Sequence, residues 1–362
     1  MLKRVRFRIY PNKKQQLFFN KTFGCCRLVY NKFLSLREDA HKLGERLSFV
    51  QTVKLLPKIK RYEGYKFLKD TIAIVLVKEL VDLQRAYDNY LKKRTGAPRF
   101  KRKCGVQKFT ICNQNDVVRI EGNYIRISKV GYVKIRQSME IGKIHSATIV
   151  KTVTGKFFVT ILFEFVPSYK CESSNAIGID VGIKEYYTDS NGNKVHNPDY
   201  LEKKYKKLRR EQRRLMRKEK GSKNYNKQRI ILAKVHEKIE NQRNDFLHKQ
   251  STKLVRENKT ICIENLFVKG MLRNHKLAKR IMSASWSKFL GFLQYKAAWY
   301  GNTIIKVPRY YPSSQTCHCC GYVNPAVRNL QVRSWECPKC HSQHDRDLNA
   351  SINILKKGLT LA

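Results

Sequence analysis

The alternation of apolar and polar residues predicts one strand, a helical segment and then a series of short strands in the first half of the chain. VRFRIYPN, at 5–12, alternates apolar and basic residues and stops at Pro-Asn, which is typical of a strand followed by a turn. Residues 13–94 are expected to be helical. Apolar residues recur there at helical spacing and should form core, at Leu68, Ile72, Val75, Leu76, Leu80, Leu83, Tyr87 and Tyr90.

Residues 104–166 have a different pattern, of short alternating segments with glycines at the turns. This pattern predicts a small antiparallel β unit. The strand within residues 1–12 is expected to join that unit. A helical segment would then be inserted between one strand and the remainder of its own sheet.

The second half, from residue 171, alternates strands with helices, which indicates an α/β domain with a mixed sheet. The predicted elements are a strand in AIGIDVGIK (176–184), a hairpin at YYTDSNGN (186–193), a long basic helical stretch (199–257), a buried strand in TICIENL (260–266), a helix (285–301) and a strand in NTIIKVP (302–308).

The charge of the chain indicates its class of partner. The 362 residues include 75 Lys+Arg and only 28 Asp+Glu, a formal net charge of +47, so a polyanion, first of all nucleic acid, is the expected partner. A membrane is not expected, because the longest apolar run, 72–77, is too short for a hydrocarbon core of about 30 Å. The first residues, MLKRVRFRIYPNKK, lack the apolar core of a signal peptide. We therefore expect a cytoplasmic, nucleoid-associated protein.

Basic residues are densest at 202–229, and they also gather at 3–8 and around Phe100 at 99–103. Bases outnumber acids too heavily in these segments for pairing to neutralise them, so phosphates are expected beside them. Because every predicted domain is basic, a channel for a long backbone is favoured over a module that reads one duplex groove.

Three acids lie in or beside apolar elements, where an unpaired carboxylate is costly. Asp180 lies inside AIGIDVG, Glu264 ends the strand at 260–263, and Asp347 lies beside the last helix. The predicted apolar face of that helix consists of Leu348, Ile352, Leu355 and Leu359. Each acid alone could simply pair with a basic residue. Together, three carboxylates at the ends of buried elements suit Mg²⁺, and two such ions about 4 Å apart catalyse phosphodiester hydrolysis.

Five of the 11 cysteines fall between 317 and 340. Cys317-His-Cys-Cys320 and Cys337-Pro-Lys-Cys340 form two CxxC pairs, a spacing typical of a structural Zn²⁺ site with four cysteine ligands. His318 and Cys319 lie inside the first pair and could compete as ligands, and a redox pair is the alternative for a single CxxC. The remaining cysteines are expected to be small buried apolar residues, at Cys25, Cys26, Cys104, Cys112, Cys171 and Cys262.

GIDVG (178–182), IENL (263–266) and HDRDLNASIN (344–353), in this order and with the cysteine pairs before the last, resemble the RuvC-type nuclease domain of the TnpB family. TnpB proteins are transposon-associated, RNA-guided endonucleases related to type V CRISPR effectors. FGCCRLVYN and GAPRFKRK in the first half are also similar to that family.

The resemblance implies a fold of α/β, β and α parts. An RNase-H-like RuvC domain would span 171–362, with the basic helical region 199–257 and a zinc-knuckle insert at 313–343. A small β-barrel-like wedge unit would comprise 1–12 and 97–170, and a helical recognition domain, 13–96, would be inserted in it.

By the same resemblance, Asp180, Glu264 and Asp347 are the catalytic acids that bind two Mg²⁺ ions. The family pattern selects Asp347, two residues before Asn349, and leaves Asp345 as a helix cap or a supporting neighbour. The implied partners are a guide RNA from the transposon end and double-stranded target DNA, read next to a short flanking motif. The sequence leaves the oligomeric state open, with a monomer favoured.

Three other functions remain open at this point. A nuclease-inactive descendant would repress transcription under RNA guidance, although the intact acids at 180, 264 and 347 argue against it. A DNA transposase would act directly on transposon ends. A miniature CRISPR effector would use the same three acids.

Overall fold

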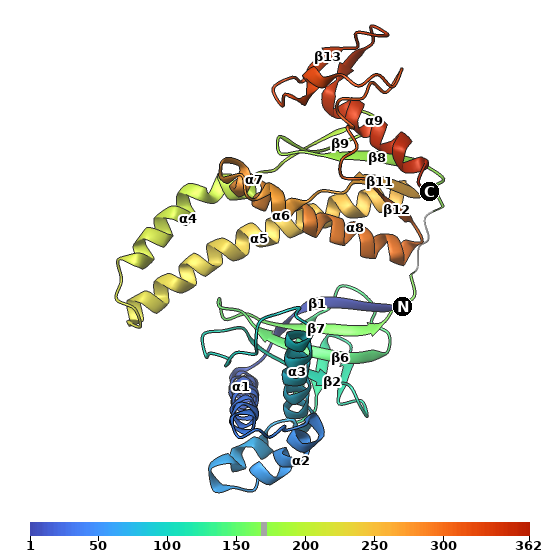
Figure 1. Ribbon diagram of the computed structural model, residues 1–362. Coiled ribbons are helices and arrows are strands. Elements are labelled where there is room, and N and C mark those ends of the chain that lie inside the picture. Colours follow the sequence, from blue (N-terminus) through green and yellow to red (C-terminus); the bar gives the residue numbers. More distant parts are fainter. Residues whose placement is uncertain (168–171) are drawn as a thin grey trace. The chain divides into compact units, whose positions relative to one another are not determined.

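The computed structural model describes residues 1–167 and 172–362 (Figure 1). The chain divides into two compact units, Met1–Val166 and Pro167–Ala362. Cys171 and the expected domain border at 170/171 lie outside the described residues. No helix in the described ranges combines the length and the apolar character needed to cross a membrane.

The first unit contains a sheet of seven strands in the order β2-β6-β7-β1-β5-β4-β3, and every neighbouring pair is antiparallel. Its strands are β1 (Leu2–Tyr10), β2 (Gln107–Cys112), β3 (Val118–Glu121), β4 (Tyr124–Ile127), β5 (Gly131–Arg136), β6 (Ile144–Lys151) and β7 (Phe157–Glu164). The prediction that the first strand joins the later ones is confirmed, because β1 lies between β5 and β7.

Between β1 and β2 the chain forms α1 (Lys13–Lys42), α2 (Phe49–Ile59), the 3-10 helix η1 (Glu63–Asp70) and α3 (Ala73–Leu91). Their buried side chains form one core with those of the sheet. Six residues of the predicted apolar stripe are buried, from Leu68 to Leu83. The prediction is wrong for Tyr90, which is 46% exposed, because it lies in the last turn of α3, beyond the reach of the core.

The second unit is an α/β fold built on a five-stranded mixed sheet in the order β10-β9-β8-β11-β12. Its strands are β8 (Ala176–Val181), β9 (Glu185–Asp189), β10 (Lys194–His196), β11 (Thr260–Glu264) and β12 (Thr303–Val307). The first three form an antiparallel meander, whereas β11 runs parallel to both β8 and β12. The mixed sheet that the sequence predicts is therefore present.

The helices of this unit cover both faces of the sheet (Figure 1). They are α4 (Tyr200–Met216), α5 (Lys223–Glu257), α6 (Val268–Met271), α7 (His275–Ala284), α8 (Trp286–Tyr300) and α9 (Arg346–Leu359). Ile177 and Ile179 of β8 pack with residues of α5 and α8, such as Leu254. On the opposite face, Cys262 of β11 packs with Ile354 of α9.

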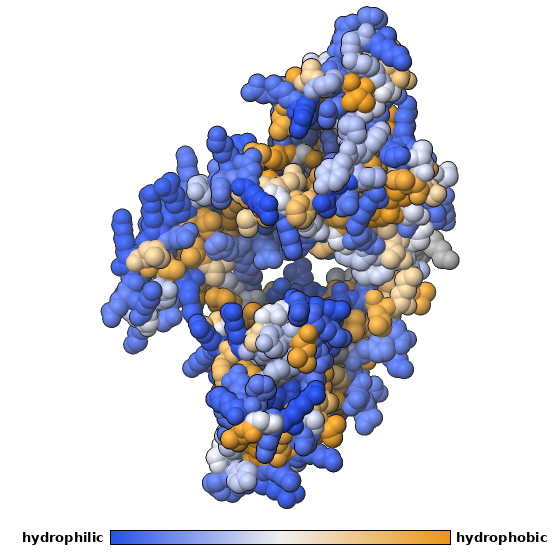
Figure 2. Space-filling view, viewed as in Figure 1, coloured by the Kyte–Doolittle hydropathy of each residue, from blue (hydrophilic) through white to orange (hydrophobic). Residues whose placement is uncertain are grey.

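The predicted basic stretch 199–257 is two helices, α4 and α5, joined by a turn at Gly221. Glu211 of α4 is buried, accepts a hydrogen bond of 2.8 Å from Gln228 of α5 and pairs with Arg214 at 3.3 Å. The bond from Gln228 thus links α5 to a buried acid of α4. Figure 2 shows hydrophilic residues over much of this hairpin.

The prediction of an apolar face on the last helix is wrong for most of its residues, although Leu355 packs against the core. Leu359 is 48% exposed, and Leu348, Ile352 and Leu355 are only partly buried. The fully buried positions of α9 carry mainly small or polar side chains, at Ala350, Ser351, Asn353, Ile354 and Gly358, besides Arg346 and Asn349. Leu355 packs against the core at Cys262, but the close contacts at Gly178 and Gly358 place small residues of the helix nearest the sheet.

Candidate active site

Asp180 and Glu264 lie side by side on neighbouring parallel strands. The register of β8 and β11 pairs Ile179 with Ile263, so the two acids occupy the next position on each strand. Successive side chains of a strand point to opposite faces. Because the isoleucines pack toward α5 and α8, both carboxylates lie on the face that α9 covers.

Asp347 reaches the same face from the first turn of α9. The helix lies against β8 at Gly178, where an added Cβ would be 2.1 Å from the carbonyl oxygen of Ser351. A second glycine, Gly358, meets Cys262 of β11, and a Cβ there would lie 2.2 Å from the sulfur atom. Asp347 lies one turn before Ser351 on the same side of the helix. Two glycines therefore allow the approach that brings Asp347 to the acids of the sheet.

The electrostatic surroundings of Asp180 show that the three acids are neighbours. Burial, followed by the negative charges of Glu264 and Asp347, raises the pKa of Asp180 well above its ordinary value, while Arg346 and Arg333 oppose the rise. Burial also raises the pKa of Glu264. The structure thus brings together the three acids that the sequence singles out.

This acid cluster is more open than a preformed single-ion site. Among the residues that the structure describes, the oxygens of the three acids do not all lie within 4.8 Å of one another. Asp180, Glu264 and Asp347 each keep partial exposure to solvent.

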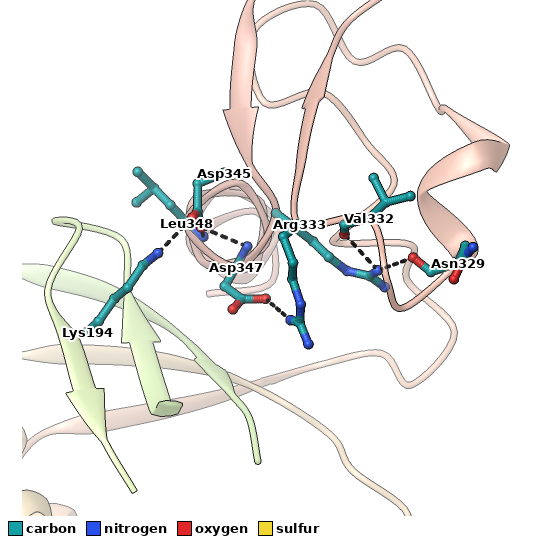
Figure 3. Close-up of polar contacts among 8 residues, drawn as sticks. Lys194, Asn329, Val332, Arg333, Asp345, Asp347 and Leu348 are labelled. Carbon is teal, nitrogen blue, oxygen red and sulfur yellow. Dashed lines mark hydrogen bonds and ion pairs between the residues drawn. The ribbon is translucent and has the colours of Figure 1, made fainter. Parts of the chain in front are cut away.

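Asp345 has a different environment from Asp347, although the two are close in sequence. Its carboxylate caps α9 and accepts hydrogen bonds from the backbone N–H groups of Asp347 (3.1 Å) and Leu348 (3.0 Å). It also pairs with Lys194 at 2.7 Å. Figure 3 shows Asp345 turned toward Lys194 and Asp347 turned toward Arg333. The prediction that Asp345 is a helix cap is confirmed.

Two arginines beside the acids were not singled out in the sequence. Arg333 Nη1 lies 3.4 Å from Asp347 Oδ1. Arg346 is buried and donates hydrogen bonds to the carbonyl oxygens of Asn329 (2.6 Å) and Val332 (3.3 Å). In a chain with 75 Lys+Arg, no local pattern distinguishes these two from the others.

Cys317, Cys320, Cys337 and Cys340 gather into one cluster, with all four sulfur atoms within 4.8 Å of one another. The Sγ atoms of Cys317 and Cys340 are 3.6 Å apart, and those of Cys320 and Cys337 are 3.5 Å apart. Zn–S bonds of about 2.3 Å in a tetrahedron would place the sulfurs about 3.8 Å apart. The donor set therefore fits Zn²⁺.

A second group overlaps the first, because Cys317, Cys319 and His344 also lie within 4.8 Å of one another. His344 Nε2 is 3.1 Å from the sulfur of Cys317. Of the remaining described cysteines, Cys25, Cys26 and Cys262 are buried as predicted, and Cys112 is partly buried. The prediction is wrong for Cys104, which is exposed in a loop before β2 where no apolar element covers it.

Two asparagines of α9 fix the cysteine segment to the helix, a role that the sequence pattern does not indicate. Asn349 and Asn353 are buried and each donates to the carbonyl oxygen of Thr316, at 2.8 and 2.5 Å. Asn353 also donates to Ser313 O at 2.9 Å. These bonds link the chain just before Cys317 to the helix that carries Asp347.

The chain matches three family descriptions, namely "Probable transposase" at residues 160–275, "Cas12f1-like, TNB domain" at 286–354 and "Helix-turn-helix domain" at 1–46. It is 37% identical to a "Putative RNA-guided DNA endonuclease" of Streptomyces pristinaespiralis, over 98% of this chain and 89% of that protein. It is 29% identical to the "Putative RNA-guided DNA endonuclease InsQ" of Escherichia coli (strain K12), over 99% of this chain and 92% of that protein.

Among solved structures, the chain is similar to that titled "Structure of the mini-RNA-guided endonuclease CRISPR-Cas_phi3", with 10% identity and a TM-score of 0.47 over 99% of this chain and 92% of that one. This likeness is too loose to add to the fold described above. By its own fold and site, the second unit is an α/β domain with a cluster of three acids on one face of a mixed sheet. The chain belongs to the TnpB family, as the sequence motifs predict.

Proposed function

We propose that this protein is an RNA-guided DNA endonuclease of a mobile element, which cuts target DNA next to a short flanking motif. The observation that carries the proposal is the meeting of Asp180, Glu264 and Asp347, from three separate elements, on one face of the sheet. Membership of the TnpB family, whose relatives bear this activity in their names, supports it.

The topology of the second unit supports an RNase-H-like, RuvC-type domain at 171–362. Three antiparallel strands are followed in the sheet by two parallel ones, and the acids lie at the carboxyl ends of β8 and β11. The antiparallel sheet of the first unit would form the wedge (1–12 and 97–170), and α1 to α3 the recognition domain (13–96).

Asp180, Glu264 and Asp347 would hold two Mg²⁺ ions, since carboxylate oxygens are the ligands that Mg²⁺ prefers. Bound there, the ions would activate a water molecule and stabilise the leaving oxygen in phosphodiester hydrolysis. The raised pKa of Asp180 supports this assignment, because it reflects the burial of Asp180 and then the negative charges of Glu264 and Asp347, which cations would neutralise.

Cys317, Cys320, Cys337 and Cys340 would hold a structural Zn²⁺ in a knuckle at 313–343. With four protein ligands, the ion has no open position for a substrate. Its role would be to keep the knuckle folded. The hydrogen bonds of Asn349 and Asn353 would then hold α9 in a fixed position against the folded knuckle.

The partners that fit the charge are a guide RNA and double-stranded target DNA. The helices α4 and α5 present a dense basic surface, and further bases lie on β1 and at 99–103. Such a distribution suits the backbone of a long guide–target duplex, which is held by its shape while base pairing reads the sequence.

The experiment is to express the protein with its flanking transposon end, purify it with bound RNA and add target DNA and Mg²⁺. We expect a discrete RNA with a variable end, and cutting that is lost in Asp180→Ala while target binding is kept. Asp245→Ala, an exposed acid of α5, is the matched control and should cut normally. Target binding without cutting by the unmutated protein would indicate a repressor, and heterogeneous RNA would indicate a transposase.

A further inference from the structure

A hollow with a volume of about 420 Å³ opens beside Glu264. Its walls include Phe267 and Gly270, which follow Glu264 in the chain, and Arg309, which follows β12. Because Glu264 pairs with Val307 of β12, the two chain segments leave the sheet next to each other. The hollow is thus a direct neighbour of the acid cluster.

The ring of Phe267 is held in place although it is 48% exposed. It lies so close to the backbone of Gly270 that an added Cβ there would be 2.4 Å from a ring carbon. The guanidinium carbon of Arg309 lies over the ring, 4.7 Å from its centroid. The contacts with Gly270 and Arg309 therefore fix the ring of Phe267 at the wall of the hollow. Burial in a hydrophobic core does not explain the position of this ring.

A ring and a cation in this arrangement suit an unpaired nucleotide. Aromatic side chains bind single-stranded nucleic acid by stacking on the bases, and arginine pairs with the phosphates. Stacking tolerates any base, as an enzyme guided by RNA requires.

We propose that Phe267 and Arg309 form a nucleotide subsite, in which one unpaired base of the DNA strand being cut stacks against the Phe267–Arg309 pair next to the scissile phosphate. The proposal rests on the proposed nuclease function, because it takes Glu264 as the neighbouring metal ligand. The subsite positions the strand, so Phe267 and Arg309 are binding residues and not metal ligands. The occupant is the DNA strand and not the guide RNA, because the hollow adjoins the acids that cut.

The first test places a single abasic nucleotide at successive positions across the cut site of a synthetic target. With the unmutated protein, we expect one position at which loss of the base slows cutting by roughly ten- to a hundredfold. Phe267→Ala should slow cutting of the intact target by a similar factor, and the abasic nucleotide should add no further loss. In Phe267→Trp the abasic nucleotide should still slow cutting, whereas in Phe267→Leu it should not.

The second test measures stacking without cutting. A 2-aminopurine base at the same position should lose fluorescence when the target binds to guide-loaded Asp180→Asn protein, and the loss should disappear when Phe267→Ala is added. The melting temperature and guide-RNA binding of each variant establish that it is folded.

Equal abasic penalties in the unmutated protein and Phe267→Ala at every position, or quenching that does not depend on Phe267, would overturn the subsite. Cutting that still requires Asp180 would leave the proposed function standing in that case. Conversely, quenching that depends on Phe267 in a protein that never cuts would support the subsite and contradict the nuclease. Dependence on a base of the guide RNA, and not of the DNA, would also overturn the proposal.

Discussion

Gly178 of β8 and Ser351 of α9 are in backbone contact, so close that a Cβ on Gly178 would lie 2.1 Å from the Ser351 carbonyl oxygen. This contact determines how closely the last helix approaches the sheet. Because Asp347 lies one turn before Ser351, the same contact places the third acid relative to Asp180 and Glu264.

Gly178→Ala should therefore displace α9 and weaken both the fold and the site. Overpacking of a closely packed core costs about 1–3 kcal/mol, and we expect DNA cutting to fall by at least roughly tenfold. Chemical denaturation and single-turnover cutting rates are the measurements. Gly291→Ala in α8, where no neighbouring atom lies within 4 Å of the new Cβ, is the matched control. Equal effects of the two substitutions would contradict this role of Gly178.

Asp345→Asn and Asp347→Asn should have opposite outcomes. Asparagine caps helices about as well as aspartate, and the exposed ion pair of Asp345 with Lys194 is worth about 1 kcal/mol or less. Asp345→Asn should therefore keep most of the cutting activity. Asp347→Asn should lose roughly a hundredfold or more, because a metal ligand is removed. Cutting rates at saturating Mg²⁺ distinguish the two, and the reverse order would assign the third acid to Asp345.

The raised pKa of Asp180 predicts how the stability of the metal-free protein depends on pH. The folded state keeps the proton to higher pH than the unfolded chain, whose carboxyl pKa is about 4. The free energy of unfolding should therefore fall as pH rises from about 4 through the raised pKa, and stay reduced above it.

Asp180→Asn should remove this contribution and raise the melting temperature of the metal-free protein at neutral pH. Mg²⁺ should stabilise the unmutated protein, since it binds only the folded state, and should stabilise the variant far less. Thermal melts over a pH series with and without Mg²⁺ measure both effects. An Asp180→Asn protein less stable than the unmutated one at neutral pH would refute the argument, and Asp245→Asn serves as the surface control.

Cys337→Ser should abolish zinc binding, whereas Cys319→Ser should retain it. Cys337 is buried in the four-sulfur cluster, and Cys319 is exposed and outside that set. Metal analysis of the purified proteins gives the zinc content directly. Loss of zinc should also expose the knuckle to proteolysis and reduce cutting, because the segment that fixes α9 unfolds. If Cys319→Ser lost the metal and Cys340→Ser kept it, the ligands would be the overlapping group with His344.

Replacing exposed lysines of α4 by neutral residues should weaken RNA binding and make the affinity depend less on salt concentration. Lys203, Lys206 and Lys207 are exposed, and glutamine at these positions preserves the helix. A plot of log affinity against log salt concentration has a negative slope, and each lost phosphate contact reduces its magnitude by about 0.7–0.9. The slope of the triple variant should therefore be smaller in magnitude by about 2–3. Binding titrations at several salt concentrations measure the slope. An unchanged slope would place the guide RNA elsewhere.

The elements of this fold follow closely from local pattern. Alternation at 5–12 predicts β1. A single acid in an otherwise apolar strand indicates Asp180 and Glu264 as site residues, because burying a carboxylate is costly unless a cation or hydrogen-bond donors meet it. Cysteine spacing likewise predicts the cluster that the structure contains.

The contacts between segments that lie far apart in the sequence do not follow from local pattern. The leucines of the last helix have the right period for a buried face, yet α9 packs through Ser351 and Gly358, because glycine and cysteine on the sheet allow a closer contact than leucine permits. Asn349 and Asn353 look like surface residues until the chain before Cys317 is found against them.

The sequence by itself determined the order of strands and helices, the acids and the cysteines, since these depend on residue type and on spacing along the chain. Only the tertiary structure decided which side of α9 meets the sheet, that Arg333 pairs with Asp347, and that Phe267 lines a hollow beside Glu264. These outcomes depend on distances between segments far apart in the chain, and backbone approach at a few glycines sets those distances.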